Sequence, residues 1–337
     1  MQAIIMAGGS GTRLRPVSTS QNPKQFMTFK NWKSLLQTTY ERMFDITQNH
    51  NHIRISSNAL YQDQILSHLS IYQNSQIILE PSKQNTAPAF ACVIKYLLDH
   101  TSCDMDEIIL FCPADQLIHP SSRFVSYVHD AYTIAQQGKI VLFGVQPNRP
   151  ETGYGYIHCA DMLSDQSVYQ ISKFVEKPDR QTAQTYIDQG NYFRNAGTFM
   201  MSIRTLMRQF SLYCPDIASL MELDYDAFIS QYHTLLNISI DYAVMEKTQD
   251  AMLIPMIITW SDIWSRDSIY IEWEKDLHDN VVIWNHITNT GSHNMIYSTQ
   301  DRKIVIDDCH DIIVVDSADG VYIARRGNSQ NIKQFIS

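Results

Sequence analysis

The sequence predicts an α/β fold with one dominant parallel β-sheet, followed by a small β-rich domain. Through about residue 230, short apolar runs alternate with longer helix-like stretches, the pattern expected when helical crossovers join parallel strands. From Val281 onward the pattern changes to short β-rich pieces between turn residues. At 337 residues, the chain exceeds the usual size of one compact core. We therefore expect a large domain over residues 1–270 and a smaller domain over residues 271–337.

Five short apolar runs in the first half are expected to form buried parallel strands. They cover residues 4–6, 53–55, 77–79, 108–111 and 141–143. Helices are expected between them, over residues 35–44, 85–98 and 122–136. Asn85 and Ser122 stand where a helix N-cap is needed, because short polar side chains accept hydrogen bonds from the first turn.

The last third is expected to form a compact stack of strands. Its β-rich pieces cover residues 281–283, 295–297, 304–306, 312–315 and 321–323. Their spacing of about 8 to 14 residues resembles that of stacked β coils or a small β roll. The polar segment 272–280 places the domain boundary near residue 270.

The composition disfavours several classes of function. The formal net charge of -9 argues against nucleic acid or an anionic membrane as partner, because a polyanion would be repelled. The six cysteines lack CxxC spacing, so we expect reduced thiols and neither structural zinc nor a disulfide framework. No apolar run approaches the roughly 20 residues that cross a bilayer, and no basic leader precedes the first strand. We therefore expect a cytoplasmic protein.

A glycine-rich turn directly after the first strand predicts a phosphate-binding loop. The turn covers residues 7–14 and reads AGGSGTRL, where backbone amides can approach phosphate oxygens because glycines carry no Cβ. Its spacing is neither that of the Rossmann GxGxxG nor that of a P-loop. Arg13, Arg15 and Lys24 form a local basic cluster in an acidic chain, which indicates a small anionic ligand.

Together with Pro23 and Lys24, this turn matches the pattern GxGxRxxP…PK, and on these residues the chain resembles the nucleotidyltransferases that make NDP-sugars. Further motifs follow in order over nearly the whole chain, and they resemble those of the mannose-1-phosphate guanylyltransferases (GDP-mannose pyrophosphorylases). These motifs read EPSKQNTAPA from residue 80, PAD from 113, FGVQP from 143, PETGYGYI from 150, FVEKP from 174, NAGTF from 195, SIDYAVMEK from 239 and WSD from 260.

The resemblance implies a Rossmann-like, mixed and mostly parallel sheet sandwiched by helices, as in glycosyltransferase-A-like folds, with a β-helix-like C-terminal domain. Residues 1–270 would then be the nucleotidyltransferase catalytic domain. The resemblance implies transfer of GMP from GTP to α-D-mannose 1-phosphate, giving GDP-mannose and pyrophosphate, with Mg²⁺ as cofactor. A sugar 1-phosphate oxygen is already ionised at neutral pH, so attack on the α-phosphorus needs positioning and charge neutralisation more than a general base.

The resemblance also implies a short, single-activity form. Bifunctional relatives carry a C-terminal mannose-6-phosphate isomerase domain, and this sequence ends at Ser337. The β-rich tail is then expected to fold over the catalytic domain or to mediate a homodimer.

The resemblance assigns roles to the residues of each motif. Arg13 and Lys24 would be catalytic, holding the triphosphate and stabilising charge on the pyrophosphate leaving group. Asp115 and Asp262 would hold Mg²⁺, which takes few protein ligands and keeps phosphates or waters in its other positions. The nucleotide-binding residues would be Ala7, Gly8, Gly9, Ser10, Gly11, Thr12, Asn85 and Thr86. The sugar-phosphate-binding residues would be Gly153, Glu176, Lys177 and Asn195.

Simpler structural roles stand beside several of these assignments. Asn85 is equally suited to cap a helix, and an isolated aspartate such as Asp115 or Asp262 often caps a turn. Outside the motif, Glu176 and Lys177 would be a charged turn at the end of a strand.

The chain departs from the family pattern at several positions. Arg15, Gln84, Gln116, Ala196 and Trp264 stand where the family usually has tryptophan, arginine, histidine, serine and glycine. Losing the arginine at position 84 removes a charge-assisted contact to nucleotide, and Trp264 would crowd the wall beside the metal. Two alternatives therefore stay open. One is a guanylyltransferase for another sugar 1-phosphate, such as a heptose or deoxy sugar, and the other is a non-catalytic regulatory paralogue that binds GDP-mannose.

Overall fold

The computed structural model describes residues 1–337 except 10–17, 19–22, 29–32, 71–75, 163–167, 263–268, 271–272, 284–285, 319 and 328–337. The chain falls into two compact units, each assembled from separate stretches of sequence. Unit 1 contains Met1–Gly8, Leu36–Ala114 and Ile118–Trp260. Unit 2 contains Gly9–Leu35, Asp115–Leu117 and Ser261–Ser337. The domain boundary near residue 270 stays a prediction.

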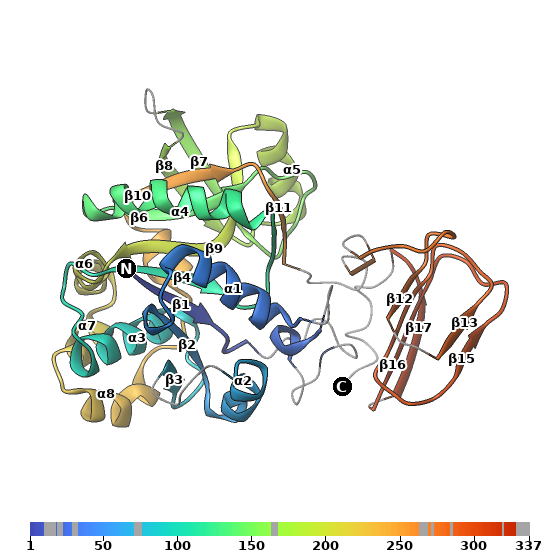
Figure 1. Ribbon diagram of the computed structural model, residues 1–337. Coiled ribbons are helices and arrows are strands. Elements are labelled where there is room, and N and C mark those ends of the chain that lie inside the picture. The colour runs from blue at the N-terminus through green and yellow to red at the C-terminus, as the bar shows by residue number, and fades with distance from the viewer. Residues whose placement is uncertain are drawn as a thin grey trace. The chain divides into compact units, whose positions relative to one another are not determined.

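Unit 1 is built on a nine-stranded mixed sheet with the order β3-β2-β1-β4-β9-β6-β10-β8-β7 (Figure 1). β1 pairs in parallel with β2 and β4, β2 with β3, and β6 with β10. β9 runs antiparallel between β4 and β6. The strands are β1 (Gln2–Met6), β2 (Ile53–Asn58), β3 (Ile77–Glu80), β4 (Ile108–Pro113), β6 (Ile140–Val145), β7 (Gly155–Met162), β8 (Tyr169–Glu176), β9 (Tyr192–Ser202) and β10 (Ala251–Met256).

All five strands predicted in the first half are confirmed, as is the mixed α/β class. β1, β4 and β6 read as largely apolar runs because helices cover both faces of the sheet, so a polar side chain there would cost free energy. Phe90 stacks on Phe111 with ring centroids 3.7 Å apart in the resulting core. The carboxyl ends of β1, β2, β3 and β4 meet at one edge, where α/β sheets bind their ligands.

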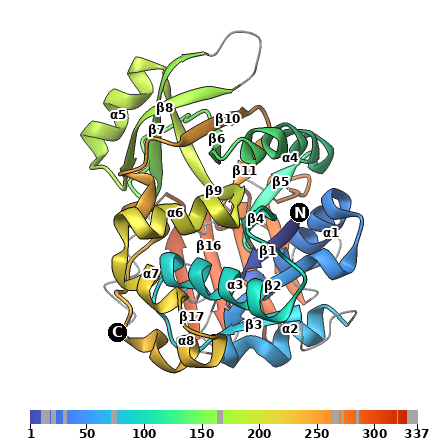
Figure 2. The same ribbon diagram turned by 90° about the vertical axis from the view of Figure 1, so that its left-hand side faces the viewer.

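The helices of unit 1 lie on both faces of this sheet. Figure 2 shows α3, α6, α7 and α8 gathered on one face, and α4 packs against β6, β9 and β10. The helices are α1 (Leu35–Thr47), α2 (Gln62–His68), α3 (Thr86–His100), α4 (Ser121–Gln136), α5 (Arg180–Gln189), α6 (Ile203–Tyr213), α7 (Pro215–Met221) and α8 (Tyr225–Gln231). The short helical segments of unit 1 are η4 (His50–His52), η5 (Ala59–Tyr61), η7 (Tyr232–Thr234) and the π-helix η8 (Asp241–Met245), and η2 (Lys24–Phe26) belongs to unit 2. β5 (Leu117–His119) and β11 (Thr259–Ser261) are short strands outside the main sheet.

The three predicted helices are confirmed, and one of the two predicted caps is wrong. The Asn85 side chain accepts a hydrogen bond from the Thr86 backbone N–H and caps α3. Ser122 is not a cap, because α4 begins one residue earlier, at Ser121, and its N-cap position is Pro120. A proline there supplies an extended backbone at the helix entrance but no capping side chain.

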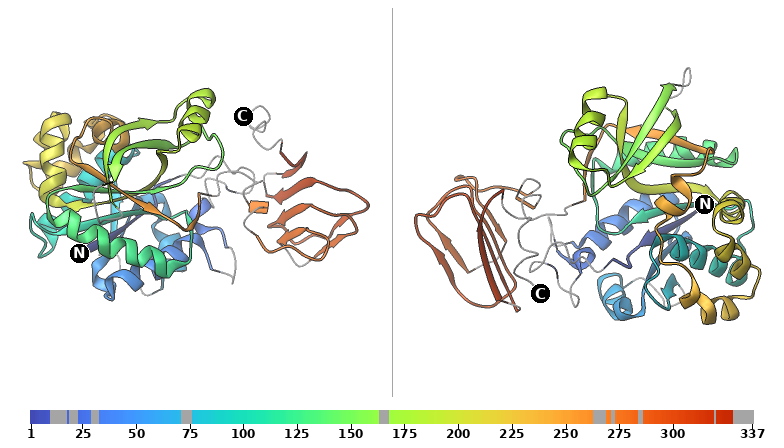
Figure 3. Two further views of the ribbon diagram at one scale, coloured as in Figure 1. Left: turned by 90° about the horizontal axis from the view of Figure 1, so that it is seen from above. Right: turned by 180° about the vertical axis from the view of Figure 1, so that it is seen from behind.

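The C-terminal part of unit 2 is a stack of β coils, as predicted. β12 (Val281–Ile283), β14 (Met295–Ser298) and β16 (Ile312–Ser317) pair in parallel, and β13 (Ile287–Asn289) pairs in parallel with β15 (Ile304–Ile306). The chain thus alternates between two sheets (Figure 3). Ile296, Ile306 and Val314 form one buried apolar cluster. β17 (Gly320–Arg325) pairs antiparallel with β16 and ends the larger sheet. The short strand β13 was not predicted, because ITN carries little apolar signal.

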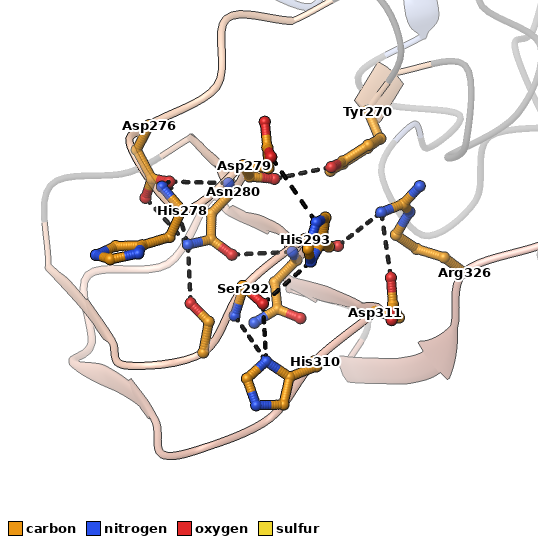
Figure 4. Close-up of polar contacts among 12 residues, drawn as sticks. Tyr270, Asp276, His278, Asp279, Asn280, Ser292, His293, His310, Asp311 and Arg326 are labelled. Carbon is orange, nitrogen blue, oxygen red and sulfur yellow. Dashed lines mark hydrogen bonds and ion pairs between the residues drawn. The ribbon is translucent and has the colours of Figure 1, made fainter.

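Buried asparagine side chains join successive coils at their turns (Figure 4). Asn280 Oδ1 accepts from the Asn294 backbone N–H at 2.9 Å, and Asn294 Oδ1 accepts from the Ile312 backbone N–H at 3.1 Å. Asp276 in turn accepts two hydrogen bonds from the Asn280 amide. A Cβ on Gly291 would lie 1.7 Å from the Cys309 carbonyl oxygen, so only glycine fits at this turn.

No helix within the described ranges is both long and apolar enough to cross a membrane.

Candidate functional site

The predicted phosphate loop begins at the carboxyl end of β1, within unit 1. The Ala7 backbone N–H donates to the Ser56 carbonyl at 2.8 Å, and the Ser57 hydroxyl donates to the Ala7 carbonyl at 3.0 Å. These bonds from β2 fix the start of the turn. The rest of the loop, residues 10–14 with the predicted catalytic Arg13, lies outside the described residues.

Glu80, which sequence reasoning did not select, lies beside the start of this loop at the end of β3. Its side chain is buried, with Oε1 accepting from the Ser56 hydroxyl at 3.1 Å and Oε2 from the Tyr232 hydroxyl at 3.4 Å. A Cβ on Gly8 would lie 3.2 Å from Glu80 Oε1, so the glycine leaves room for this carboxyl group. Burial raises the pKa of Glu80, against the lowering effect of both hydrogen bonds. The sequence feature that could have identified Glu80 is its position at the end of a buried strand.

No positive side chain within the described part of the chain pairs with Glu80, although the residue is only 8% exposed. A buried carboxylate without a cation costs free energy, because its hydration is lost without an opposite charge in return. Such a group at the ligand-binding edge of the sheet is suited to accept hydrogen bonds from a ligand.

Asn85 and Thr86, predicted to bind nucleotide, hold a neighbouring segment in place. Asn85 caps α3 and its amide lies 3.5 Å from the Asn237 side-chain oxygen. The Thr86 hydroxyl accepts a hydrogen bond from the Ile240 backbone N–H at 2.8 Å. Gln84, one of the departures from the family pattern, donates to the His233 carbonyl at 3.0 Å. The structural reading of Asn85 is therefore confirmed, and its nucleotide contact stays a prediction.

Three of the predicted site residues meet in unit 2. Lys24 Nζ lies 3.0 Å from Asp115 Oδ2 and 2.6 Å from Asp262 Oδ1, and it also donates to the Asp262 carbonyl oxygen. Lys24 is 4% exposed, whereas both aspartates remain partly open to solvent. Only the family resemblance brought these residues together beforehand, since 238 positions separate Lys24 from Asp262.

The short helix η2 presents Lys24 to the two carboxylates. Gln25 donates from Nε2 to the Gly9 carbonyl at 3.1 Å, which ties η2 to the glycine turn within unit 2. Met27 is buried among apolar side chains of the β coils, including Met295 and Ile313. The β-coil region therefore helps to anchor the segment that carries Lys24.

The charges of this cluster shift the pKa of Lys24. Burial alone would lower it, because a charged ammonium loses hydration. The carboxylates of Asp115 and Asp262 outweigh burial, and they raise the pKa of Lys24 above its usual value. Lys24 therefore stays protonated at neutral pH, as a permanent positive charge facing two negative ones.

The two aspartates fit a divalent cation. Their carboxylate oxygens converge on one point, which the Lys24 ammonium marks, and hard oxygen donors are what Mg²⁺ prefers. Across the described ranges, no group of three or more His, Cys, Asp or Glu side chains could hold a metal ion. A cation here would therefore rely on Asp115 and Asp262 together with oxygens from water or substrate.

The predicted sugar-phosphate residues lie in unit 1, around the end of β8. Lys177 Nζ lies 2.7 Å from Glu176 Oε1, and Glu246 accepts from the Glu176 backbone N–H at 3.0 Å. Lys177 has a φ of 49°, and its backbone N–H donates to the Tyr154 carbonyl at 3.1 Å. These bonds fix the turn after β8 and hold both charged side chains next to each other.

Two glycines of the PETGYGYI motif have different surroundings. A Cβ on Gly155 would lie 2.7 Å from Glu176 Oε2, so this glycine leaves space for the glutamate. A Cβ on Gly153 would meet nothing within 4 Å. Described neighbours therefore do not require glycine at position 153, and its approach to the sugar stays a prediction.

Arg194 supports the loop that carries Gly153. Its guanidinium lies 5.6 Å from the centroid of the Tyr154 ring and 5.8 Å from that of Trp260, and it donates to Asn148 at 3.4 Å. Burial lowers the pKa of Arg194, although the group stays charged at neutral pH. Cation–π contacts replace part of the hydration that this buried arginine loses.

Asp241 joins the sugar-phosphate residues and was not among those predicted. Asn195 Nδ2 donates to Asp241 Oδ1 at 3.1 Å, while Asn195 Oδ1 accepts from the Gly197 backbone N–H at 3.0 Å. Burial and the charge of Glu176 raise the pKa of Asp241 to about 7. Its motif, SIDYAVMEK, was visible in the sequence, but nothing there showed that η8 packs against β8.

Comparison with known proteins gives consistent similarities. The family model described as Nucleotidyl transferase matches residues 2–279. The mannose-1-phosphate guanylyltransferase of Escherichia coli is 33% identical to this chain over 349 residues, which cover 99% of this chain and 74% of that protein. The alginate biosynthesis protein AlgA of Pseudomonas syringae pv. tomato is 34% identical, over 100% of this chain and 71% of that protein. A crystal structure from Thermus thermophilus, described as a mannose-1-phosphate geranyltransferase, has a TM-score of 0.85 at 26% identity, covering 99% of this chain and 97% of that chain.

Proposed function

Because this chain belongs to the nucleotidyl transferase family, we propose that it transfers GMP from GTP to mannose 1-phosphate, giving GDP-mannose and pyrophosphate. The relatives that carry the name mannose-1-phosphate guanylyltransferase support the choice of sugar and base, since their similarity extends over nearly the whole chain. The observation that carries the proposal is the convergence of Lys24, Asp115 and Asp262, which supplies the charges that phosphoryl chemistry needs.

Glu80 supports guanine as the base. The Watson–Crick edge of guanine carries two adjacent N–H donors, at N1 and N2, and a carboxylate accepts both. Adenine presents an acceptor at N1 and would face Glu80 with unfavourable charge. The buried Glu80 carboxyl group beside Gly8, at the edge where β1 and β3 end, is the acceptor that we assign to this contact.

Nucleotidyltransferases of this family generally use a divalent metal ion, and we propose Mg²⁺ here. Asp115 and Asp262 would hold it. When bound, Mg²⁺ would neutralise charge on the phosphate oxygens of GTP.

The reaction is a displacement at phosphorus. An ionised phosphate oxygen of mannose 1-phosphate forms a bond to the α-phosphorus of GTP, and the bond between that phosphorus and the α–β bridging oxygen breaks. Pyrophosphate leaves with the bond's electron pair. Lys24 and Arg13 donate to the leaving group, while Lys177 holds the incoming sugar phosphate and Glu176 accepts hydrogen bonds from sugar hydroxyls. By the family resemblance, backbone amides of residues 8–12 would donate to the triphosphate.

The experiment that tests this function is pyrophosphate release by the purified protein with Mg²⁺, across a matrix of nucleotides and sugar phosphates. The nucleotides are GTP, ATP, UTP and dTTP, and the sugars are the 1-phosphates of mannose, glucose, a manno-heptose and a 6-deoxyhexose. We expect release with GTP and mannose 1-phosphate to exceed every other pair. A larger rate with the heptose or the deoxy sugar would show that this sugar, and not mannose, is the substrate. No release with any pair would contradict the enzymatic function.

The cytoplasmic location and the homodimer remain predictions from the sequence. Cell fractionation and light scattering of the purified protein test them, and neither result affects the proposed reaction.

A further inference from the structure

Asp241 has hydrogen-bond donors around it, and the Lys177 ammonium that lowers its pKa forms its ion pair with Glu176 instead. Its carboxyl group accepts from the Asn195 amide at 3.1 Å and from the Ser239 hydroxyl. Across the described part of the chain, no lysine, arginine or histidine forms an ion pair with it, whereas the nearby Lys177 ammonium lies 2.7 Å from Glu176. The Lys177 ammonium therefore lies near two acidic groups, Glu176 and Asp241, and it forms its ion pair with Glu176.

The groups around Asp241 come from several elements. β8 and the turn after it contribute Glu176 and Lys177, and β9 contributes Asn195. The segment around η8 itself carries Ser239, Glu246 and Lys247. The thiol of Cys214, which follows α6, donates to the Ala243 carbonyl, while the arginines of α6 pair elsewhere, Arg204 with Asp106 and Arg208 with Asp250.

Sugar-phosphate binding would change this balance. A sugar 1-phosphate brings close to two negative charges at neutral pH, since the second pKa of a phosphate monoester is about 6. Lys177 cannot neutralise the phosphate and Glu176 equally well, so its charge is drawn toward the phosphate. Two neighbouring carboxylates that lose their shared cation cannot both remain ionised at low cost.

We propose that Asp241 takes up a proton when the sugar 1-phosphate binds, and that the protonated Asp241 and the ionised Glu176 then act together on the sugar hydroxyls. This inference rests on the proposed function, because it assumes a sugar 1-phosphate beside Lys177. No covalent bond to carbon or phosphorus changes in the step, and solvent supplies the proton. A neutral carboxyl group offers one O–H donor as well as acceptors, which matches a sugar hydroxyl that both donates and accepts.

In the free protein, Asp241 is already partly protonated at neutral pH. With a pKa of about 7, Asp241 is about half protonated at neutral pH, so a modest further increase completes the uptake. The sign follows from linkage: if the complex binds more protons than the free protein, affinity falls as pH rises. For an increase of two pKa units or more, the dissociation constant of mannose 1-phosphate should rise about fivefold between pH 7 and pH 8.

The test is titration calorimetry of mannose 1-phosphate into the whole protein with Mg²⁺ and α,β-methylene GTP, which cannot release pyrophosphate. Runs in PIPES and in Tris separate proton uptake from the intrinsic heat, because these buffers differ in ionisation enthalpy. We expect uptake of about half a proton per site at pH 7 in the unmodified protein, relative to Asp241→Asn. The difference removes the phosphate's own ionisation, which is common to both proteins.

Asp188→Asn on α5 is the matched control, because Asp188 accepts only from Gln184 among the described residues and should leave proton uptake unchanged. If Asp241→Asn fails to fold, carbon NMR of the aspartate carboxyl groups in the unmodified protein replaces it, and one signal should shift its pKa upward with mannose 1-phosphate. Equal uptake with and without Asp241, binding without uptake, or no binding of mannose 1-phosphate would each overturn the inference.

The two proposals fail separately. GDP-mannose formation without proton uptake at Asp241 leaves the function standing and overturns the inference. Proton-linked binding of mannose 1-phosphate without any GDP-mannose formation leaves the inference standing and overturns the function.

Discussion

The Lys24 ammonium lies 2.6 Å from the Asp262 carboxylate, although 238 positions separate the two residues. Asp115 completes the cluster, with its Oδ2 3.0 Å from the same ammonium. Lys24 therefore joins two motifs that the chain brings together only by folding.

Replacing Lys24 with methionine should lower kcat by about a hundredfold or more. The change keeps a long, unbranched side chain but removes a donor to the leaving group, and losing one such donor typically costs about 3 kcal/mol in the transition state. Steady-state rates of pyrophosphate release measure the effect. The same substitution at Lys33, an exposed lysine of the same unit, serves as control, and equal rates for the two variants would contradict the role of Lys24.

Much of this architecture was predictable from the sequence, because its buried strands are largely apolar runs. The five strands of the first half, three helices and all five β-rich pieces of the tail were predicted, and the family resemblance is confirmed. The antiparallel β9 was not, because its eleven residues mix polar and apolar types and include the motif NAGTF. Its position between β4 and β6 depends on pairing that no local pattern specifies.

The candidate site was predictable only where a motif named it. Lys24, Asp115 and Asp262 came from motifs, and their meeting follows from the fold. Glu80 and Asp241 lay inside quoted motifs but were not selected, because the hydrogen-bond partners and charges that surround each carboxyl group come from packing rather than from local sequence. Arg13 lies outside the described residues, so its role remains a prediction.

Replacing Glu80 with glutamine should weaken guanine recognition specifically. Glutamine keeps the shape but exchanges one acceptor oxygen for an N–H₂ group, which would face the guanine N–H donors. We expect KM for GTP to rise about tenfold or more, as for the loss of a charge-assisted hydrogen bond. ITP, which lacks the N2 amino group, provides the matched substrate.

The comparison of GTP with ITP isolates the base contact. The preference of the unmodified protein for GTP over ITP should shrink in Glu80→Gln, while KM for mannose 1-phosphate stays constant. An unchanged ratio of GTP to ITP would remove Glu80 from base recognition.

Substitution of Gly155 by alanine should impair the sugar side of the reaction. The added methyl group would lie 2.7 Å from Glu176 Oε2 and 2.7 Å from Phe174 Cζ, and it would displace both the carboxylate and the ring. KM for mannose 1-phosphate should therefore rise several-fold with little change in KM for GTP. Gly153→Ala is the variant for comparison, because its methyl group meets no described protein atom within 4 Å. A rise in the sugar KM for Gly153→Ala would then report direct contact with the substrate.

The raised pKa of Asp241 predicts a pH-dependent effect on stability. An acid whose folded-state pKa exceeds its unfolded value binds more protons when folded, so it lowers stability as pH rises from about 4 and reaches its full cost above about 7. Asp241→Asn removes this cost, and its Tm should exceed that of the unmodified protein more at pH 8 than at pH 5. Thermal unfolding at both pH values measures this, and an equal difference at the two would contradict the assigned titration.

The most direct test of the central claim is chromatographic measurement of GDP-mannose formed from GTP and mannose 1-phosphate with Mg²⁺. The unmodified protein and Asp130→Ala, which changes an exposed aspartate of α4, should form product at similar rates. Asp115→Ala and Asp262→Ala should lower the rate by at least about a hundredfold, since each removes one of the two carboxylates that converge on the cation position. Full activity in both variants, or no GDP-mannose from the unmodified protein, would contradict the account.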